Sequence, residues 1–256
     1  MSTVSRIPRN LCIIGPPGSG KGSYGKLLAK SLNIPLISVS HLLKNANFDI
    51  SSGKLLCDRV VNEVLVEHLV SLPRGYLLDG FPRTIRQVQW MKEKWPLELQ
   101  IDAAICLEVP KEVCMTKMLG RRACLRCEGN WNVSDVHFGN FVLPPLLPDN
   151  CSKCEGEADW CTREDDVERV VEERLQIYDT MTGPILEHFE DQGTLLRFSP
   201  YLGYKDIPRF QNELKGWLSC LDQGEKINYQ SKNARILLSG EMQGFPCREL
   251  HIGNSM

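Results

Sequence analysis

The sequence lacks the features that mark membrane-spanning and nucleic-acid-binding chains. Its longest apolar runs, "LCIIG" and "FVLPPLLP", fall far short of the roughly 20 apolar residues that a helix needs to cross a bilayer. Positive charge is not in excess, because 30 Lys and Arg stand against 32 Asp and Glu, a formal net charge of -2. This balance argues against a broad basic surface for nucleic acid or an anionic membrane. No fixed-period repeat is present either, which argues against a repeat architecture.

A secretory signal segment is also missing, since no apolar stretch precedes the first strand-like run. The chain contains 11 cysteines, which in a secreted protein would suggest disulfides. Without a signal segment we expect a reducing compartment and free thiols. The cytoplasm is the default expectation, with an organelle as the alternative because Arg6 and Arg9 lie near the start.

Short apolar strands alternate with helical patterns through most of the chain. Strands are expected at 11–14, 35–39, 75–80, 101–109 and 194–198, and helices at 26–32, 55–72, 86–95, 111–119 and from Asp165 and Asp166 onward. Gly183 and Pro184 are expected to interrupt the last helix. The alternation predicts an α/β fold with a five-stranded parallel sheet flanked by helices.

The regular pattern is lost in two regions. Residues 120–163 are rich in Cys, Gly, Pro, Asn and aromatic residues, and predict a small separate lobe inserted into the core. The core is then expected at 10–119 and 164–217. Residues 218–256 carry no sustained period and predict a loosely structured tail, in which "ARILL" is a possible added strand.

The most specific motif is "GPPGSGKGS", from Gly15 to Ser23, which matches the phosphate-loop pattern G-x-P-G-x-G-K-G-[ST]. Its glycines let backbone N–H groups converge on phosphate oxygens, and the helix that follows favours negative charge at its N-terminus. Lys21 would reach the β- and γ-phosphates, and Ser23 is the candidate hydroxyl for Mg²⁺ because Gly22 has no side chain. The ATP-binding candidates in this loop are Gly18, Ser19, Gly20, Lys21, Gly22 and Ser23. A glycine-rich turn without a ligand is the alternative, disfavoured by the strand before the loop and the helix after it.

A second segment, "GYLLDGFPR", ends a predicted strand with charged side chains. Asp79 lies at the carboxyl end of that strand, where ligand sites form in α/β sheets, and could position the hydration shell of Mg²⁺. Capping the next turn is the alternative for Asp79. Arg83 follows a proline and is suited to clamp an acceptor phosphate with two hydrogen bonds.

Two C-x-x-C pairs, Cys124 with Cys127 and Cys151 with Cys154, are separated by 23 residues. This pattern predicts a tetrahedral zinc site, because each short turn presents two thiolates to one side of the ion. Four cysteines fill the coordination sphere, so the zinc would be structural. Cys161 is a possible competing ligand, and a redox pair or a chance cluster of thiols is the alternative.

Four ordered motifs, spread over about residues 10–205, resemble the adenylate kinases and related nucleoside monophosphate kinases. "GPPGSGKG" resembles their phosphate loop and "GYLLDGFPRT" their acceptor-binding segment. "LGRRACLRC" and "CTREDDVERVVEERL" resemble their mobile lid and its hinge, and some lids of this family carry a Cys₄ zinc. The resemblance implies phosphoryl transfer from Mg-ATP to a nucleoside monophosphate, most simply ATP and AMP to two ADP, by a monomer.

The resemblance also implies site residues. The catalytic set would be Lys21, Arg83, Arg121, Arg163, Asp165 and Arg174, in which Asp165 is suited to orient Arg163. Arg121, Asn130 and Trp131 would join the phosphate loop in binding ATP, although Trp131 could equally pack inside the lid. The acceptor would be bound by Ser38, Val39, Lys44, Lys54, Leu56, Gly80, Arg83, Gln87, Arg163 and Arg174. A solvated surface position is the alternative for Arg174.

The acceptor side departs from the family pattern. "LISVSHLLK" stands in place of the family's I-S-T-G-D-L-L-R, and only "NANFDISS" separates Lys44 from "GKLL", which is shorter than the usual acceptor-closing arm. Lys44 keeps a positive charge but loses the planar fork of an arginine. The first hypothesis is therefore an active kinase, and the alternative is a catalytically weak or inactive regulatory module that retains ATP binding. A nucleic-acid-binding zinc module is disfavoured by the balanced charge.

Overall fold

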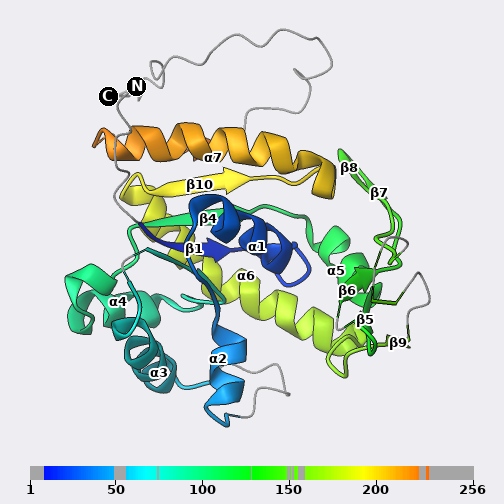
Figure 1. Ribbon diagram of the computed structural model, residues 1–256, viewed down its shortest axis with the longest axis horizontal. Helices are drawn as coiled ribbons and strands as arrows, with labels where there is room; N and C mark the ends of the chain where they lie inside the picture. Colours follow the sequence, from blue (N-terminus) through cyan, green and yellow to red (C-terminus); the bar gives the residue numbers. More distant parts are fainter. Residues whose placement is uncertain are drawn as a thin grey trace, which may run out of the picture.

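The computed structural model describes residues 9–48, 56–73, 75–127, 129–148, 151, 153–154, 159–224 and 229–230. A parallel sheet lies at the centre with helices on both faces, and a smaller β-rich lobe lies at one end (Figure 1). Of the expected features, Lys54 and the possible strand "ARILL" lie outside the described residues.

The central sheet has the strand order β11-β10-β4-β1-β3-β2, and all its pairs are parallel. The strands are β1 (Asn10–Ile14), β2 (Leu36–Ser38), β3 (Tyr76–Asp79), β4 (Ala103–Leu107), β10 (Leu195–Phe198) and β11 (Tyr229–Gln230). The five predicted strands are confirmed, and the two-residue β11 adds a sixth. Every residue of β1 and β4 is buried, as apolar strands in the middle of a parallel sheet must be.

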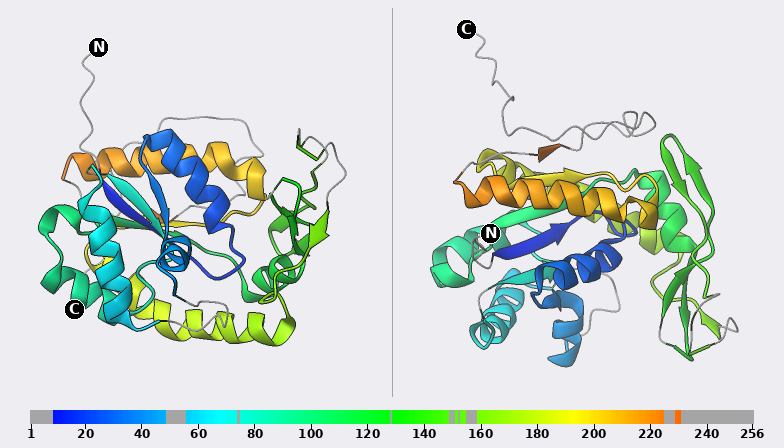
Figure 2. Two further views of the ribbon diagram at one scale, coloured as in Figure 1. Left: turned by 60° about the horizontal axis from the view of Figure 1, so that its bottom comes forward. Right: turned by 45° about the horizontal axis from the view of Figure 1, so that its top comes forward.

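Successive side chains along the strands point to opposite faces of the sheet and pack into two separate hydrophobic clusters. On β1, Leu11 and Ile13 pack with α1 (Lys21–Leu32) and α7 (Ile207–Asp222). Cys12 and Ile14 point to the other face, against α2 (Val39–Asn45), α3 (Asp58–Val70), α4 (Ile85–Lys94) and α6 (Glu168–Asp191). This alternation explains why the helices lie in two layers (Figures 1 and 2). The short helices η1 (Leu97–Leu99) and η2 (Gly203–Asp206) follow α4 and β10.

The predicted interruption at Gly183 and Pro184 is wrong, because α6 runs unbroken through both residues. An interior proline removes one backbone hydrogen bond and costs about 3 kcal/mol. Ile185 and Phe189, which follow it, are at most 1% exposed and pack against the sheet. Burial of these two side chains offsets the loss and keeps the second half of the helix in line.

The smaller lobe is inserted after α5 (Lys111–Leu119) and contains two sheets. The strands β5 (Arg121–Cys124), β6 (Asn130–Asn132) and β9 (Trp160–Cys161) form a three-stranded antiparallel sheet. The strands β7 (Val136–Phe138) and β8 (Phe141–Leu143) form a hairpin within the long spacer between the two cysteine pairs. This lobe is called the lid below.

The hairpin is docked onto the core. Phe141 and Leu143 pack with Val113 of α5, and the Phe141 ring lies 5.0 Å from the ring of Tyr201. The backbone N–H of Val142 donates to the carbonyl of Tyr201 at 2.8 Å. The long spacer therefore ties the lid to the segment that follows β10 (Figure 2).

The last helix of the core, α7, extends to Asp222, beyond the expected core boundary at residue 217. Trp217 and Leu218 are 1% and 4% exposed, because the apolar face of α7 covers β4 and β10. Asp222 also accepts hydrogen bonds from the Arg9 guanidinium, at 2.8 and 3.1 Å, which joins the helix end to the start of β1. Among the described residues, no helix combines the length and apolar character that crossing a bilayer requires.

We expect Leu218→Ala to lower the free energy of unfolding by about 2 to 5 kcal/mol, since the removed methyl groups leave a cavity in the core. Gly216→Ala is the matched control in the same helix, because a methyl group there meets open space. That change should raise the free energy of unfolding by about 0.5 to 1 kcal/mol. Urea denaturation measures both, and a loss below about 0.5 kcal/mol for Leu218→Ala would mean that this turn of α7 is not part of the core.

Candidate active site

The phosphate loop connects β1 to α1 at the carboxyl edge of the sheet. Gly18 and Gly20 have φ angles of 87° and 93°, which favour glycine. A methyl group on Gly18 would lie 2.6 Å from the carbonyl oxygen of Cys114. The loop conformation and its packing on α5 therefore both require glycine at this position.

Lys21 lies in the first turn of α1 and folds back over the loop. Its Nζ donates to the carbonyl oxygens of Gly15 and Pro16 at 2.7 and 2.9 Å. Burial lowers the pKa of Lys21 to about 8, with Asp79 opposing the shift and Arg83 and Arg174 adding to it. Three of the predicted catalytic cations thus share one region, in which Asp79 is the carboxylate that acts on Lys21.

Two serines of the loop differ in their surroundings. The Ser19 hydroxyl is buried and has no hydrogen-bond partner among the described residues. Ser23 accepts a hydrogen bond from the Tyr204 hydroxyl at 3.0 Å. Tyr204 is 50% exposed beside the phosphate loop, and the sequence reasoning missed it because "YLGYKD" matched no motif well.

Asp79 is the last residue of β3, as predicted. A methyl group on Gly22 would lie 3.9 Å from its Oδ2, so the carboxylate faces the start of α1. Asp79 therefore lies beside the start of α1, the helix that carries Lys21 and Ser23.

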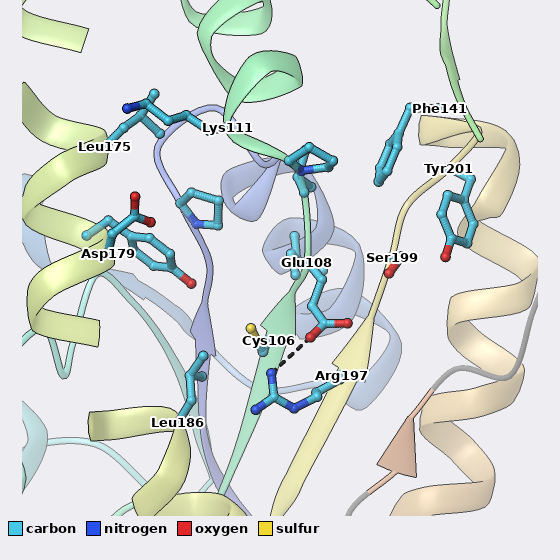
Figure 3. A pocket seen from close by; sticks show the side chains of 15 residues that line it. Cys106, Glu108, Lys111, Phe141, Leu175, Asp179, Leu186, Arg197, Ser199 and Tyr201 are labelled. Atoms are coloured by element: carbon cyan, nitrogen blue, oxygen red, sulfur yellow. Dashed lines mark hydrogen bonds and ion pairs between the residues drawn. The ribbon is translucent and has the colours of Figure 1, made fainter. Parts of the chain in front are cut away.

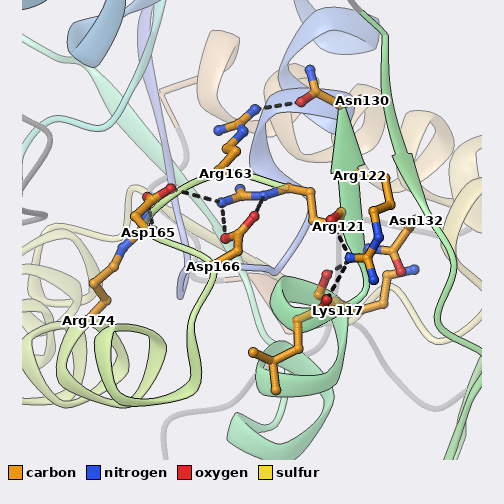
Figure 4. A network of polar contacts seen from close by, with 10 residues as sticks. Lys117, Arg121, Arg122, Asn130, Asn132, Arg163, Asp165, Asp166 and Arg174 are labelled. Atoms are coloured by element: carbon orange, nitrogen blue, oxygen red, sulfur yellow. Dashed lines mark hydrogen bonds and ion pairs between the residues drawn. The ribbon is translucent and has the colours of Figure 1, made fainter. Parts of the chain in front are cut away.

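The lid and hinge arginines form a network of charged pairs (Figure 4). Arg121 donates two hydrogen bonds to Asp166, at 2.7 and 2.5 Å. Arg174 donates to Asp165 at 2.5 Å, and Arg163 donates to the side-chain oxygen of Asn130 at 2.5 Å. The expectation that Asp165 orients Arg163 is therefore wrong in this structure, since that carboxylate pairs with Arg174.

The same arginines repel one another. Burial lowers the pKa of Arg163 and of Arg174, and the Arg121 charge lowers both further. Arg83 is affected in the same way by desolvation and by Arg174. A side-chain exposure of 24% excludes a fully solvated position for Arg174. The site thus concentrates positive charge that an anionic ligand would neutralise.

Arg122, which had no assigned role, has a local one. Its Nη1 donates to the carbonyl oxygens of Leu119 and Arg121 at 2.9 and 2.7 Å (Figure 4). These bonds satisfy carbonyls at the end of α5, where the chain enters the lid.

The acceptor segment is organised by Gln87, which is only 2% exposed. Its Oε1 accepts from the backbone N–H of Arg83 at 2.7 Å, and its Nε2 donates to Asp58 at 2.9 Å. The Thr84 hydroxyl donates to the same oxygen of Asp58 at 3.0 Å. Asp58 is therefore a central acceptor-side residue that the sequence reasoning missed.

The remaining acceptor candidates lie on the same side of the fold. Arg83 folds back on its turn, with Nε donating to the carbonyl of Gly80 at 3.0 Å. Val39 is buried, and its Cβ lies 3.7 Å from where a methyl group on Gly80 would be. The hydroxyls of Ser38 and Ser40 form a hydrogen bond of 3.2 Å. Lys44 is exposed at the end of α2, and Leu56 lines a cavity of about 510 Å³ with Asp58 and Thr84.

A second cavity, of about 390 Å³, opens beyond the ends of β4 and β10 (Figure 3). Phe141 and Tyr201 border it, and Arg197 donates to Glu108 within it at 2.9 Å. None of the predicted site residues lines this cavity.

The two cysteine pairs meet in the lid. The sulfur atoms of Cys124, Cys127 and Cys154 all lie within 4.8 Å of one another, and those of Cys127 and Cys154 are 3.8 Å apart. Cys151 is not one of these three. The backbone N–H groups of Lys153 and Cys154, and then the thiols of Cys154 and Cys127, lower its pKa to about 7. The three gathered sulfur atoms together with Cys151 are named the thiol cluster, and they offer the donor set of a tetrahedral zinc site.

The cluster excludes Cys161 for a geometric reason. On β5, Cys124 pairs with Trp160, whereas Cys161 pairs with Ala123. Neighbouring residues of a strand point to opposite faces, so Cys161 faces away from the side that carries Cys124.

The chain is similar in sequence to known proteins of one family. The adenylate kinase family model matches residues 13–194. An adenylate kinase of Syntrophotalea carbinolica is 32% identical over 82% of this chain and 98% of its own length. A GTP:AMP phosphotransferase of Plasmodium falciparum is 29% identical over 80% of this chain and 95% of its own. A probable chloroplastic adenylate kinase 6 of Oryza sativa is 33% identical over 73% and 70%.

The family match covers the phosphate loop, the acceptor segment, the lid and the hinge. A phosphate loop between β1 and α1, together with arginines from other parts of the chain, supplies what phosphoryl transfer requires. The chain therefore belongs to the adenylate kinase family and is a phosphotransferase that acts on nucleoside monophosphates.

Proposed function

We propose that the protein transfers the γ-phosphoryl group of ATP to AMP and forms two ADP. The observation that carries the proposal is that Arg83 and Arg174 lie close enough to Lys21 for their charges to lower its pKa further than burial alone does. Cations from the donor loop, the acceptor segment and the hinge fit an in-line transfer between two bound nucleotides. The relatives named as adenylate kinases and as a GTP:AMP phosphotransferase support AMP as acceptor.

The donor phosphates would replace contacts that the loop makes within itself. Lys21 would leave the carbonyls of Gly15 and Pro16 for the β- and γ-phosphates, and a phosphate oxygen would satisfy the buried Ser19 hydroxyl. Ser23 and Asp79 would hold Mg²⁺, partly through water. The ion would neutralise charge on the β- and γ-oxygens during transfer.

The arginines would change partners as the lid closes. Arg121 is paired with Asp166, Arg163 with Asn130 and Arg174 with Asp165. Phosphate oxygens could accept hydrogen bonds from the same guanidinium groups. In the transition state, charge spreads over the equatorial oxygens, where arginines are worth roughly 10³ to 10⁵ in rate. Asn130 would contact ATP. Its side chain lies on the face of β6 opposite to that of Trp131.

The acceptor would lie on the segment from Gly80 to Gln87 and against α2. Arg83 would hold its phosphate, and Gln87 would hydrogen-bond its base, with Ser38, Val39, Lys44, Lys54 and Leu56 completing the site. Gln87 would have to exchange its bond to Asp58 for the base. The inactive regulatory module is the weaker alternative, since both halves of the site are present and the relatives are named as enzymes.

Zinc in the thiol cluster is the structural part of the proposal. The cysteine spacing, the gathered sulfur atoms and the backbone N–H groups directed at Cys124 and Cys151 fit a Cys₄ zinc site. Zinc would join the two ends of the lid insertion that carry the cysteine pairs.

The remaining expectations are the domain boundaries, a monomer and the compartment. We propose that residues 120–163 move as the lid on the core and that the protein acts as a monomer. The cytoplasm is our expectation from the sequence, and the name of the chloroplastic relative supports an organelle as the alternative.

Lys21→Ala should reduce ADP formation from ATP and AMP by roughly 10³-fold or more, because the loop loses its only side-chain cation. Lys26→Ala, at an exposed position of the same helix, should leave the rate unchanged. A coupled assay with AMP, GMP, CMP and UMP measures both, and AMP should be the best acceptor. The kinase proposal is wrong if no acceptor gives ADP that depends on Lys21, and tight ATP binding in that case would favour the regulatory module.

Arg83→Lys should lower kcat/KM for AMP while leaving the affinity for ATP unchanged. A lysine keeps the charge but loses the fork that makes two hydrogen bonds to one phosphate. A charge-assisted hydrogen bond is worth about 1.5 to 3 kcal/mol, which corresponds to roughly 10- to 150-fold in kcat/KM. An equal loss in ATP affinity would place Arg83 on the donor instead.

Protein prepared without chelator should contain one zinc per chain. Replacing Cys151 and Cys154 together by Ser should abolish zinc binding and lower the melting temperature, since two of four ligands are lost. Cys161→Ser is the matched control, because that thiol faces away from the cluster. Elemental analysis and thermal unfolding are the measurements, and far less than one zinc per chain would refute the site.

A further inference from the structure

The lid contains a buried polar atom that the proposed reaction does not use. Trp131 Nε1 is inaccessible to solvent and has no hydrogen-bond partner among the described residues. Buried N–H groups nearly always have an acceptor, so a group without one calls for an explanation. The indole nitrogen is a donor only, and therefore any missing partner must be an acceptor.

The space beside Gly129 identifies the nearest candidate. A methyl group placed on Gly129 would lie 2.7 Å from Trp131 Nε1 and 3.0 Å from Cys127 Sγ. Both atoms therefore border the same small volume, which stays open because residue 129 has no side chain. The indole nitrogen is thus close to a sulfur of the thiol cluster.

Strand geometry places the indole on the correct face for this contact. On β6, Trp131 pairs with Arg122 of β5, and Asn130 pairs with Ala123. Side chains two residues apart on a strand share a face, so Trp131 lies on the same side of the lid sheet as Cys124. Asn130 lies on the opposite side, where it accepts a hydrogen bond from Arg163.

The charge of the sulfur determines how strong a hydrogen bond from the indole N–H would be. A thiol is a weak acceptor, whereas a cysteine bound to zinc is a thiolate, and hydrogen bonds to charged acceptors are about twice as strong as neutral ones. Partners of metal ligands fix the ligand orientation, and their loss commonly weakens metal binding by 10- to 100-fold.

We propose that the indole N–H of Trp131 is a hydrogen-bond donor to the Cys127 thiolate and thereby a positioning residue for zinc in the lid. The inference rests on the proposed zinc site. It assigns Trp131 to the interior of the lid rather than to the base of ATP. The glycine at position 129 has a matching role, since it leaves the volume beside the indole nitrogen and the sulfur free of a side chain.

Trp131→Phe should weaken zinc binding by about 10- to 100-fold, because the ring is kept and only the donor is removed. Trp160→Phe is the matched control: Trp160 pairs with Cys124 on the same face but is 41% exposed, so zinc affinity should be unchanged. Gly129→Ala should weaken zinc binding as well, because its methyl group would meet both partners. Competition with a zinc chelator measures the three affinities, and ATP affinity should stay the same in Trp131→Phe.

A second measurement follows zinc binding in the unchanged chain and uses Trp131→Phe only to assign one signal. The chain has 5 tryptophans, so ¹⁵N labelling gives five indole N–H signals. Zinc should shift one signal strongly, and that signal should be the one missing from the spectrum of Trp131→Phe. Normal zinc affinity in Trp131→Phe, or zinc binding without a shifted indole signal, would overturn this inference alone. Failure of the unchanged chain to bind zinc would overturn the zinc site together with it.

Discussion

The arrangement of the active site depends on concentrated positive charge at the carboxyl edge of the sheet. Lys21, Arg83 and Arg174 come from three separate parts of the chain. Burial lowers the pKa of Lys21 and of Arg83, and positive charge lowers both further: Arg83 and Arg174 act on Lys21, and Arg174 acts on Arg83. Without substrate the protein compensates this charge internally, through the carbonyls of Gly15 and Pro16 and the carboxylates of Asp165 and Asp166. In each of these contacts the donor is an N–H group from which a phosphate oxygen could also accept a hydrogen bond. The same groups can therefore stabilise the empty site and bind the nucleotides.

The lid has two separate means of holding its structure. The thiol cluster brings the two cysteine pairs together at one end, where the sulfur atoms of Cys124, Cys127 and Cys154 lie within 4.8 Å of one another. The β7–β8 hairpin packs Phe141 and Leu143 on α5 and bonds to the segment after β10. That segment continues to Tyr204, whose hydroxyl binds Ser23 of the phosphate loop. Contacts thus run from the lid spacer to the donor loop without passing through the hinge arginines.

Local patterns predicted much of this protein because their chemistry is local. The phosphate loop needs glycine backbone angles, and its lysine follows immediately in the chain. Apart from Asn10, the strands β1 and β4 are apolar along their whole length, so their burial could be expected. The cysteine spacing predicted a cluster from ligand geometry alone. In contrast, Pro184 was expected to break α6, and only the burial of Ile185 and Phe189 explains why it does not.

The sequence by itself determined the fold class, the position of the phosphate loop and the set of charged and sulfur-containing side chains available to the site. Tertiary structure alone decided which of them meet. Asp165 pairs with Arg174 rather than with Arg163. Asp58 of α3 bonds to Gln87 of α4, and Tyr204, 181 residues further along the chain, bonds to Ser23. The reason is that hydrogen bonds and ion pairs extend only a few ångströms, while the partners are far apart along the chain. Their pairing is fixed only when the sheet and its helices have packed.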